Sequence, residues 1–170
     1  MSILMILAIT TVLVFTIVGT VSAYISMSTF SELMSADVVE FRNTSKKIYN
    51  EYQKGVNSMA VMLFHQEYLD IFDFHTIGDA AIYGRKIDNI QERMETLEDE
   101  FERVQIMCME LEKMVTRYDD FGIRKFNLNS IRRYARDVYK YERLKTKFYD
   151  RCIQTNGKLI TLNALISSVI

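Results

Sequence analysis

The first apolar pattern along the chain is an unbroken run at residues 3–25, which contains no charged side chain. A helix of about 20 such residues crosses a hydrocarbon core of about 30 Å. Tyr24 lies near the end of the run, and aromatic side chains are typical of the membrane interface. The pattern therefore predicts one transmembrane helix within residues 1–25, with Tyr24 at its exit.

A cleaved signal peptide is the alternative interpretation, because Val21-Ser22-Ala23 resembles a small-residue cleavage site. Signal peptides, however, begin with a positive region and have a shorter apolar core. No Asp, Glu, Lys or Arg precedes Glu32 in this chain. We expect the segment to be retained as an anchor.

A helical rhythm follows the span. From Met34 to Tyr52 apolar residues recur at spacings of three and four, with Ser45 in the same stripe. This spacing predicts a membrane-proximal amphipathic helix within residues 26–54.

Gly55 is expected to interrupt that helix. Residues 59–83 are apolar without a clear period, and they predict a second helix or a packed connector that ends near Gly84. Residues 55–157 as a whole are predicted to form a helical bundle or coiled coil.

The most regular pattern lies between residues 87 and 118, where apolar residues alternate at spacings of three and four without a break. It predicts one long helix with a single buried seam. Met107 and Met114 widen the seam, and a wide seam favours a multi-helix bundle over a two-stranded coiled coil. The seam residues are Ile87, Ile90, Met94, Leu97, Phe101, Val104, Cys108, Leu111, Val115 and Tyr118.

A further helix is expected from about Ser130, which would be its N-cap, to Thr155. Asn156-Gly157 is expected to end it, and a turn at residues 119–122 to precede it. The apolar tail at 158–170 is too short to span a membrane, and it would pack on the bundle or lie on a membrane surface. The predicted core face comprises Ile131, Tyr134, Val138, Tyr141, Leu144, Phe148 and Cys152.

Charge separates the last two predicted helices. Residues 85–118 hold nine acids and six bases, a net charge of −3, and residues 123–158 hold eleven bases and three acids, a net charge of +8. A short turn joins the two helices, which favours an antiparallel hairpin. The opposite charges would help align the pair, although exposed ion pairs contribute little. Bases interleaved with tyrosines could also bind nucleic acid or anionic lipid. The tyrosines fall in the apolar stripe, which favours a solvated basic face instead.

The predicted fold class is all-α: one transmembrane helix followed by a long-helix coiled coil or antiparallel bundle.

Residues suited to catalysis or metal binding are sparse. His65, Asp70, Asp73 and His75 could hold a divalent metal, but their spacing matches no established metal motif. No Gly-rich phosphate loop and no Ser-His-Asp order occurs. We expect a protein that is not an enzyme and that uses no cofactor, metal or small-molecule substrate.

Two cysteines, Cys108 and Cys152, could pair if the chain is extracellular, and Cys108 is otherwise expected to be a small buried hydrophobe. Asn43-Thr44-Ser45 is an N-glycosylation sequon, which makes Asn43 a candidate acceptor outside the cytoplasm.

The order of elements over residues 5–53 resembles the N-terminal domain of nematode cuticle collagens. The matching elements are Ala23-Tyr24-Ile25, Asp37-Val38-Val39-Glu40-Phe41, Ser45, Ile48-Tyr49 and Glu51. The chain departs from the family in having no Trp and no Gly-X-Y repeat. The resemblance implies a type II anchor of the secretory pathway with an interaction role and a C-terminal part outside the cytoplasm.

The patterns predict a membrane-anchored structural or interaction protein, and the resemblance implies a relation to cuticle or extracellular matrix. Its expected partners are membrane lipid and either a second copy or another helical or collagen-like protein, with no nucleic acid. An alternative is a secreted or viral-type effector that inserts both apolar ends into membranes. Arg42, Lys46 and Lys47 follow the span closely, and by the positive-inside tendency they favour a third candidate, a cytoplasmic-facing adaptor.

Overall fold

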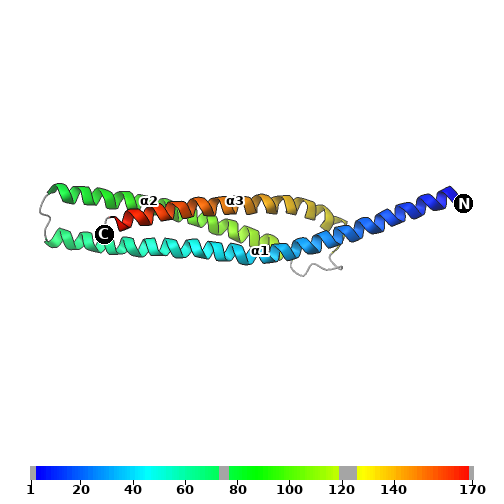
Figure 1. Cartoon of the computed structure of the whole chain (residues 1–170), viewed down its shortest axis with the longest axis horizontal. Coiled ribbons are helices and arrows are strands. Elements are labelled where there is room, and N and C mark those ends of the chain that lie inside the picture. The colour runs from blue at the N-terminus through cyan, green and yellow to red at the C-terminus, as the bar shows by residue number, and fades with distance from the viewer. Residues whose placement is uncertain (1–2, 73–76, 119–125, 169–170) are drawn as a thin grey trace. The chain divides into compact units, whose positions relative to one another are not determined.

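A computed structural model describes residues 3–72, 77–118 and 126–168, with side chains outside 65–80. Three helices packed together account for nearly all of these residues: α1 (Ile3–Phe72), α2 (Ile77–Thr116) and α3 (Leu128–Ser167) (Figure 1). No strand occurs in the described ranges. The all-α prediction is confirmed, and the apolar N-terminal run forms the start of α1.

The chain divides into two compact units, and each contains a part of every helix. The first unit combines Met1–Val39 with Leu111–Leu144, and the second unit combines Glu40–Glu110 with Lys145–Ile170. Each unit is a three-helix assembly with side chains of its own in the core.

Phe30 is the centre of the core in the first unit. Its ring lies edge-on to Tyr118, Tyr134 and Tyr141, with centroid separations of 5.7, 5.4 and 5.5 Å. Edge-to-face pairs add roughly 0.5–1.5 kcal/mol beyond area burial. The neighbouring Ser31 hydroxyl donates to the Tyr118 carbonyl at 2.8 Å, which joins α1 to the end of α2.

Two hydrogen bonds join α1 to α3 in the same unit. The Tyr134 hydroxyl donates to the Ser26 carbonyl at 3.3 Å, and the Tyr141 hydroxyl donates to Asp37 at 2.7 Å. The later residue of α3 pairs with the later residue of α1, so these two helices run in the same direction.

Aromatic pairs also join the helices of the second unit. Phe41 of α1 contacts Phe148 of α3 with centroids 5.2 Å apart, and Tyr52 of α1 stacks on Phe101 of α2 at 5.8 Å. Aliphatic and sulfur-containing side chains complete the core, and each large one contributes about 1.5–3 kcal/mol before entropy costs. The buried ones from α2 and α3 are Ile87, Ile90, Met94, Leu97, Val104, Cys108, Cys152, Leu159, Leu162 and Ile166.

Every residue of the predicted seam is buried, with at most 7% of its surface exposed. Seven of them, from Ile87 to Cys108, belong to the second unit, and Leu111, Val115 and Tyr118 belong to the first. The three-four spacing brings the nine seam residues from Ile87 to Val115 to one side of α2, where α1 and α3 cover them, and Tyr118 follows two residues after the end of α2.

The predicted helix break at Gly55 is wrong, because α1 continues through it to Phe72. A Cβ atom at Gly55 would lie 3.0 Å from Asn163 Oδ1 of α3 and 3.1 Å from Met94 Cε of α2. The missing side chain therefore permits close helix approach at the core of the second unit. That packing offsets the roughly 1 kcal/mol that a helical glycine costs.

Both predicted ends of the third helix are wrong. Asn127, rather than Ser130, caps α3: its side-chain oxygen accepts from the Ser130 amide, and the Ser130 hydroxyl accepts from the Asn127 amide, each at 2.9 Å. The helix then passes through Gly157 to Ser167. The reason is that the buried stripe continues beyond Gly157 at spacings of three and four, through Leu159, Leu162 and Ile166.

The apolar tail at 158–170 therefore packs on the bundle over its described residues, which is the first of its two predicted alternatives. Gly84 lies inside α2 and ends no helix. The expected boundaries at 54/55 and 157/158 fall within α1 and α3. The turn predicted at 119–122 lies outside the described residues.

Candidate functional site

The most unusual surface of the molecule is the start of α1. Every residue from Ile3 to Ser22 is exposed, including Leu4 at 82% and Phe15 at 74%. A continuous apolar surface of this length is costly in water and matches the hydrocarbon core of a bilayer. By length and composition this segment is a candidate membrane span.

The polar side chains of this segment satisfy their own hydrogen-bonding groups. The hydroxyls of Thr11, Thr16 and Thr20 donate to the carbonyls four residues earlier, at 2.7, 2.7 and 2.9 Å. The Thr10 hydroxyl donates to the Ile6 carbonyl in the same way. Such bonds let threonine lie in lipid without an unsatisfied donor.

The apolar exposed surface ends where the bundle begins. Tyr24 is half-buried and lies edge-on to Phe126, just before α3, with ring centroids 5.5 Å apart. Met27 is the first fully buried residue of α1. The change from exposed to buried apolar side chains thus takes less than two turns of one helix.

A groove of about 520 Å³ lies between α2 and α3 in the second unit. Leu97 and Leu162 contribute apolar surface to the groove. Ile153 also lines the groove, and 71% of the surface of Ile153 is exposed. Gly157 also lines the groove, and an added Cβ would meet nothing within 4 Å there. An exposed isoleucine beside an open glycine suits the close approach of another helix.

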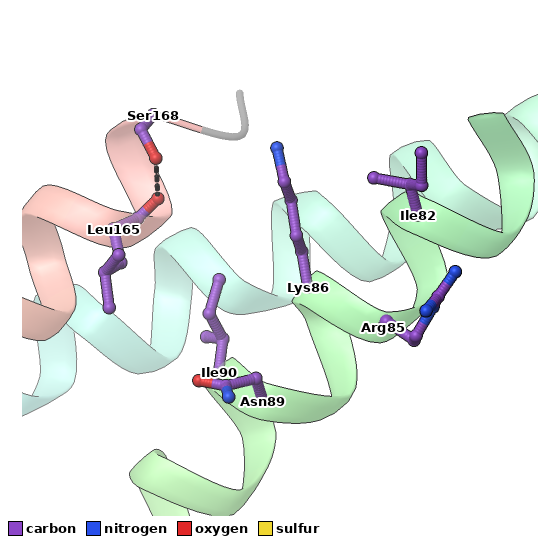
Figure 2. Close-up of a pocket in the computed structure, with 7 residues that line it drawn as sticks. All are labelled: Ile82, Arg85, Lys86, Asn89, Ile90, Leu165 and Ser168. Atoms are coloured by element: carbon purple, nitrogen blue, oxygen red, sulfur yellow. Dashed lines mark hydrogen bonds between the residues drawn. The ribbon is translucent and has the colours of Figure 1, made fainter.

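A second hollow, of about 400 Å³, lies between α2 and the end of α3 (Figure 2). Arg85, Lys86 and Asn89 of α2 line it with Ile82 and Ile90, and the dashed line in Figure 2 is the 2.7 Å bond from the Ser168 hydroxyl to the Leu165 carbonyl. Among the residues that the structure describes, cations, an amide and a hydroxyl line the hollow, and no carboxylate or imidazole does. These residues do not make an acid–base pair.

One buried polar pair lies in the core of the first unit. The Tyr118 hydroxyl donates to Asp137 Oδ2 at 3.0 Å, and the two residues are 4% and 6% exposed. Burial first, and the bond to Asp137 second, raise the pKa of Tyr118 well above its ordinary value of 10.0. The tyrosine therefore stays neutral and serves as a fixed donor to the buried carboxylate.

An ion pair between a buried carboxylate and an exposed lysine lies in the second unit. Glu100, only 8% exposed, pairs with Lys158 at the edge of the groove. Its second oxygen, Oε2, and the buried Thr155 hydroxyl have no hydrogen-bond partner among the described residues.

Sequence reasoning missed these polar pairs. Asp37, Glu100 and Asp137 each lie directly beside a position of an apolar stripe: Val38, Phe101 and Val138 respectively. An acidic residue directly beside a wide apolar stripe is the sequence feature that could have indicated these buried carboxylates.

The two cysteines are buried in the second unit, and they form no disulfide with each other in the structure. Burial first, and the neighbouring Cys108 second, raise the pKa of the Cys152 thiol to about 11.

The Asn43 side chain is exposed, whereas Phe41 is fully buried. The metal candidates from His65 to His75 lie outside the residues whose side chains the structure describes.

Among the described side chains, no group of three or more His, Cys, Asp or Glu residues is placed to hold a metal ion. The geometry offers an anchor segment, a groove and buried polar pairs. Comparison with protein-family models, with curated proteins and with solved structures finds no match for this chain.

Proposed function

We propose that this chain is a non-enzymatic, membrane-anchored helical protein that binds other helices. The observation that carries the proposal is the single unbroken helix α1, whose first twenty residues are an exposed apolar segment and whose continuation enters the bundle core. Because no loop separates the segment from the bundle, the anchor holds the first unit directly at the membrane surface.

The interaction part of the proposal rests on the groove between α2 and α3. Ile153 and Ile160 are 71% and 62% exposed, and they flank Gly157 on α3. Small residues with flanking aliphatic ones allow close helix packing. We favour a second copy of the chain as the partner, because one exposed apolar patch on each copy can form a self-complementary interface.

The alternative of a membrane-inserting effector has less support. It requires the tail at 158–170 to be free, but Leu159, Leu162 and Ile166 are each at most 1% exposed on the bundle. Deleting the tail should therefore impair folding of the second unit while leaving the chain in the membrane. Loss of membrane binding after the deletion would support the effector instead.

The anchor is tested by extraction. Full-length chain in cell membranes should resist high salt and alkaline carbonate, and a variant lacking residues 3–22 should be released. N-terminal mass spectrometry of the same sample shows whether the segment is retained. Release of the full-length chain, or cleavage after Ala23, would contradict the anchor.

The side of the membrane is tested at Asn43. The collagen resemblance implies that the bundle lies outside the cytoplasm, whereas basic residues close to the span favour the cytoplasmic side. Expression of wild type and Asn43→Gln in a secretory system separates the two. A glycosidase-sensitive mobility shift in wild type alone would place the bundle in the lumen and support the resemblance, and its absence would favour the cytoplasm.

Self-association is tested by the size of the chain in detergent or nanodiscs. Ile153→Glu places a charge on the groove and should convert the assembly to a monomer. Ile106→Glu is the matched control, because Ile106 is an exposed isoleucine of α2 outside the groove lining. A wild-type chain that is monomeric at all concentrations would overturn this partner.

A further inference from the structure

The start of α3 lies beside the point where α1 leaves its apolar segment, within the first unit. Two contacts show this: the ring pair of Tyr24 with Phe126, and the 3.3 Å bond from the Tyr134 hydroxyl to the Ser26 carbonyl. Because α3 runs in the same direction as α1 here, its first two turns occupy the same level as the exit of the apolar segment.

Those first two turns carry a concentrated positive charge. Arg132, Arg133 and Arg136 are all exposed, and none forms an ion pair or hydrogen bond through its side chain with the described residues. The carboxylate that follows them, Asp137, faces the core and accepts from Tyr118. Among the described residues no carboxylate pairs with these three arginines, so the described outer surface of this segment is basic.

The same segment also exposes an apolar side chain. Leu128, the first residue of α3, has 64% of its surface exposed. The reciprocal bonds between Asn127 and Ser130 hold this turn in a helical conformation. Interfacial segments combine apolar side chains that lie below the headgroups with cations that lie among them, and Leu128 and the arginines after it offer both kinds of side chain.

We propose that residues 128–136 at the start of α3 form a second membrane contact, which binds anionic lipid headgroups through Arg132, Arg133 and Arg136. The proposal rests on the proposed anchor, which holds this segment at the bilayer surface. Tyr134 contacts Ser26 at the exit, and the three arginines lie within two residues of Tyr134. Each helical residue advances about 1.5 Å, so along the helix the arginines lie within about one Debye length of the exit. Lys140 and Arg143 continue the basic stripe farther from it.

A nucleic-acid surface would use the same arginines. Membrane lipid is the favoured partner because the cluster lies at the end of an apolar segment and begins with an exposed leucine. Phosphate-backbone binding requires neither feature. A basic residue close to an anionic bilayer contributes about 1 kcal/mol, so three correspond to roughly a hundredfold shift of the docking equilibrium.

The absence of Trp from the chain provides the test. Leu128→Trp introduces a single indole, and the full-length chain is placed in nanodiscs of phosphatidylcholine, with or without about one third phosphatidylserine. Lipids with a headgroup nitroxide quench an indole that docks at the surface. We expect at least twofold stronger quenching in the anionic discs than in the neutral discs. High salt should abolish this difference.

Matched variants show which arginines cause the stronger quenching in anionic discs. In the Leu128→Trp background, the triple variant Arg132→Gln, Arg133→Gln and Arg136→Gln should reduce quenching to the level of neutral discs. The control triple Arg85→Gln, Arg93→Gln and Arg103→Gln removes the same charge from α2 in the second unit, and should leave quenching unchanged. An equal loss in both triples would show a net-charge effect and overturn the proposal.

Other results would also overturn it. Equal quenching in neutral and anionic discs would remove the lipid contact. A short oligonucleotide that binds wild type but not the first triple, without any dependence on lipid charge, would assign the arginines to nucleic acid. Failure of the chain to enter nanodiscs at all would contradict the anchor instead, which separates the two proposals.

Discussion

The first and second units are built from the same three helices, but different interactions hold their cores. In the first unit, Phe30 meets three tyrosine rings, and the hydroxyls of Tyr118 and Tyr141 bond to Asp137 and Asp37. In the second unit, aromatic pairs such as Phe41 with Phe148 lie among aliphatic, methionine and cysteine side chains, and the buried carboxylate of Glu100 pairs with the exposed Lys158 while its second oxygen has no partner among the described residues.

The comparison distinguishes interactions that orient the helices from interactions that stabilise the packed core. Hydrogen bonds and edge-on rings fix the rotation and register of helices, whereas apolar burial supplies most of the free energy with little directional preference. The tyrosine hydroxyl bonds to Asp137, Asp37 and Ser26 all lie in the unit that contains the apolar segment. Precise placement matters most there, because the proposed lipid contact needs α3 at the level of the exit.

The largest effect is expected from Leu97→Asp in the second unit. A carboxylate at this 3% exposed position would be buried without a partner, and we expect a loss of about 4 kcal/mol or more in the free energy of unfolding. Circular dichroism during urea unfolding measures it. Thr96→Asp, the exposed neighbour, should change stability by less than about 0.5 kcal/mol. Unchanged helicity and stability in Leu97→Asp would refute the seam.

Tyr118→Phe tests the directional core of the first unit. The change removes the donor to the buried Asp137 carboxylate and should cost about 1–3 kcal/mol of unfolding free energy. Tyr139→Phe removes a hydroxyl at a position that is 71% exposed, so it should be nearly neutral. Equal denaturation midpoints for the two variants would mean that the buried bond contributes nothing.

Alkaline pH should weaken both units. The pKa values of Tyr118 and Cys152 are raised above their ordinary values of 10.0 and 9.0, so the folded chain binds these protons more tightly than the unfolded chain. Their stabilising contributions are complete below the ordinary values and are lost as the pH rises above them. Thermal melting from pH 7 to pH 11 should show a plateau to about pH 9 and then a fall. Tyr118→Phe with Cys152→Ala should flatten the fall, and an identical fall in this double variant would contradict the assignment.

The smallest effect is expected at the helical glycines. Gly84→Ala should raise stability by about 0.5–1 kcal/mol, because alanine favours the helix and nothing lies within 4 Å of the new Cβ. Gly55→Ala should lack this gain, because its Cβ would press on Asn163 and Met94. Equal gains in the two variants would show that α1, α2 and α3 do not approach closely at Gly55.

Much of the fold could be predicted from local patterns. The three-four spacing from Ile87 to Tyr118 identified the buried side of α2, since helical periodicity alone determines which side chains share a face. The predictions failed at Gly55 and Gly157, where local propensity favoured a break. Propensities of about 1 kcal/mol yield to the burial of several large side chains farther along the helix.

The sequence by itself determined the helical class, the apolar N-terminal segment and the seam, because each depends on residues that are close together in the chain. Only the tertiary structure decided that Tyr118 would reach Asp137, that Gly55 would admit two neighbouring helices, and that Arg132 would lie at the exit of the apolar segment. These pairings join residues separated by 19 to about 108 positions. Their geometry depends on helix direction and register, which no local pattern encodes.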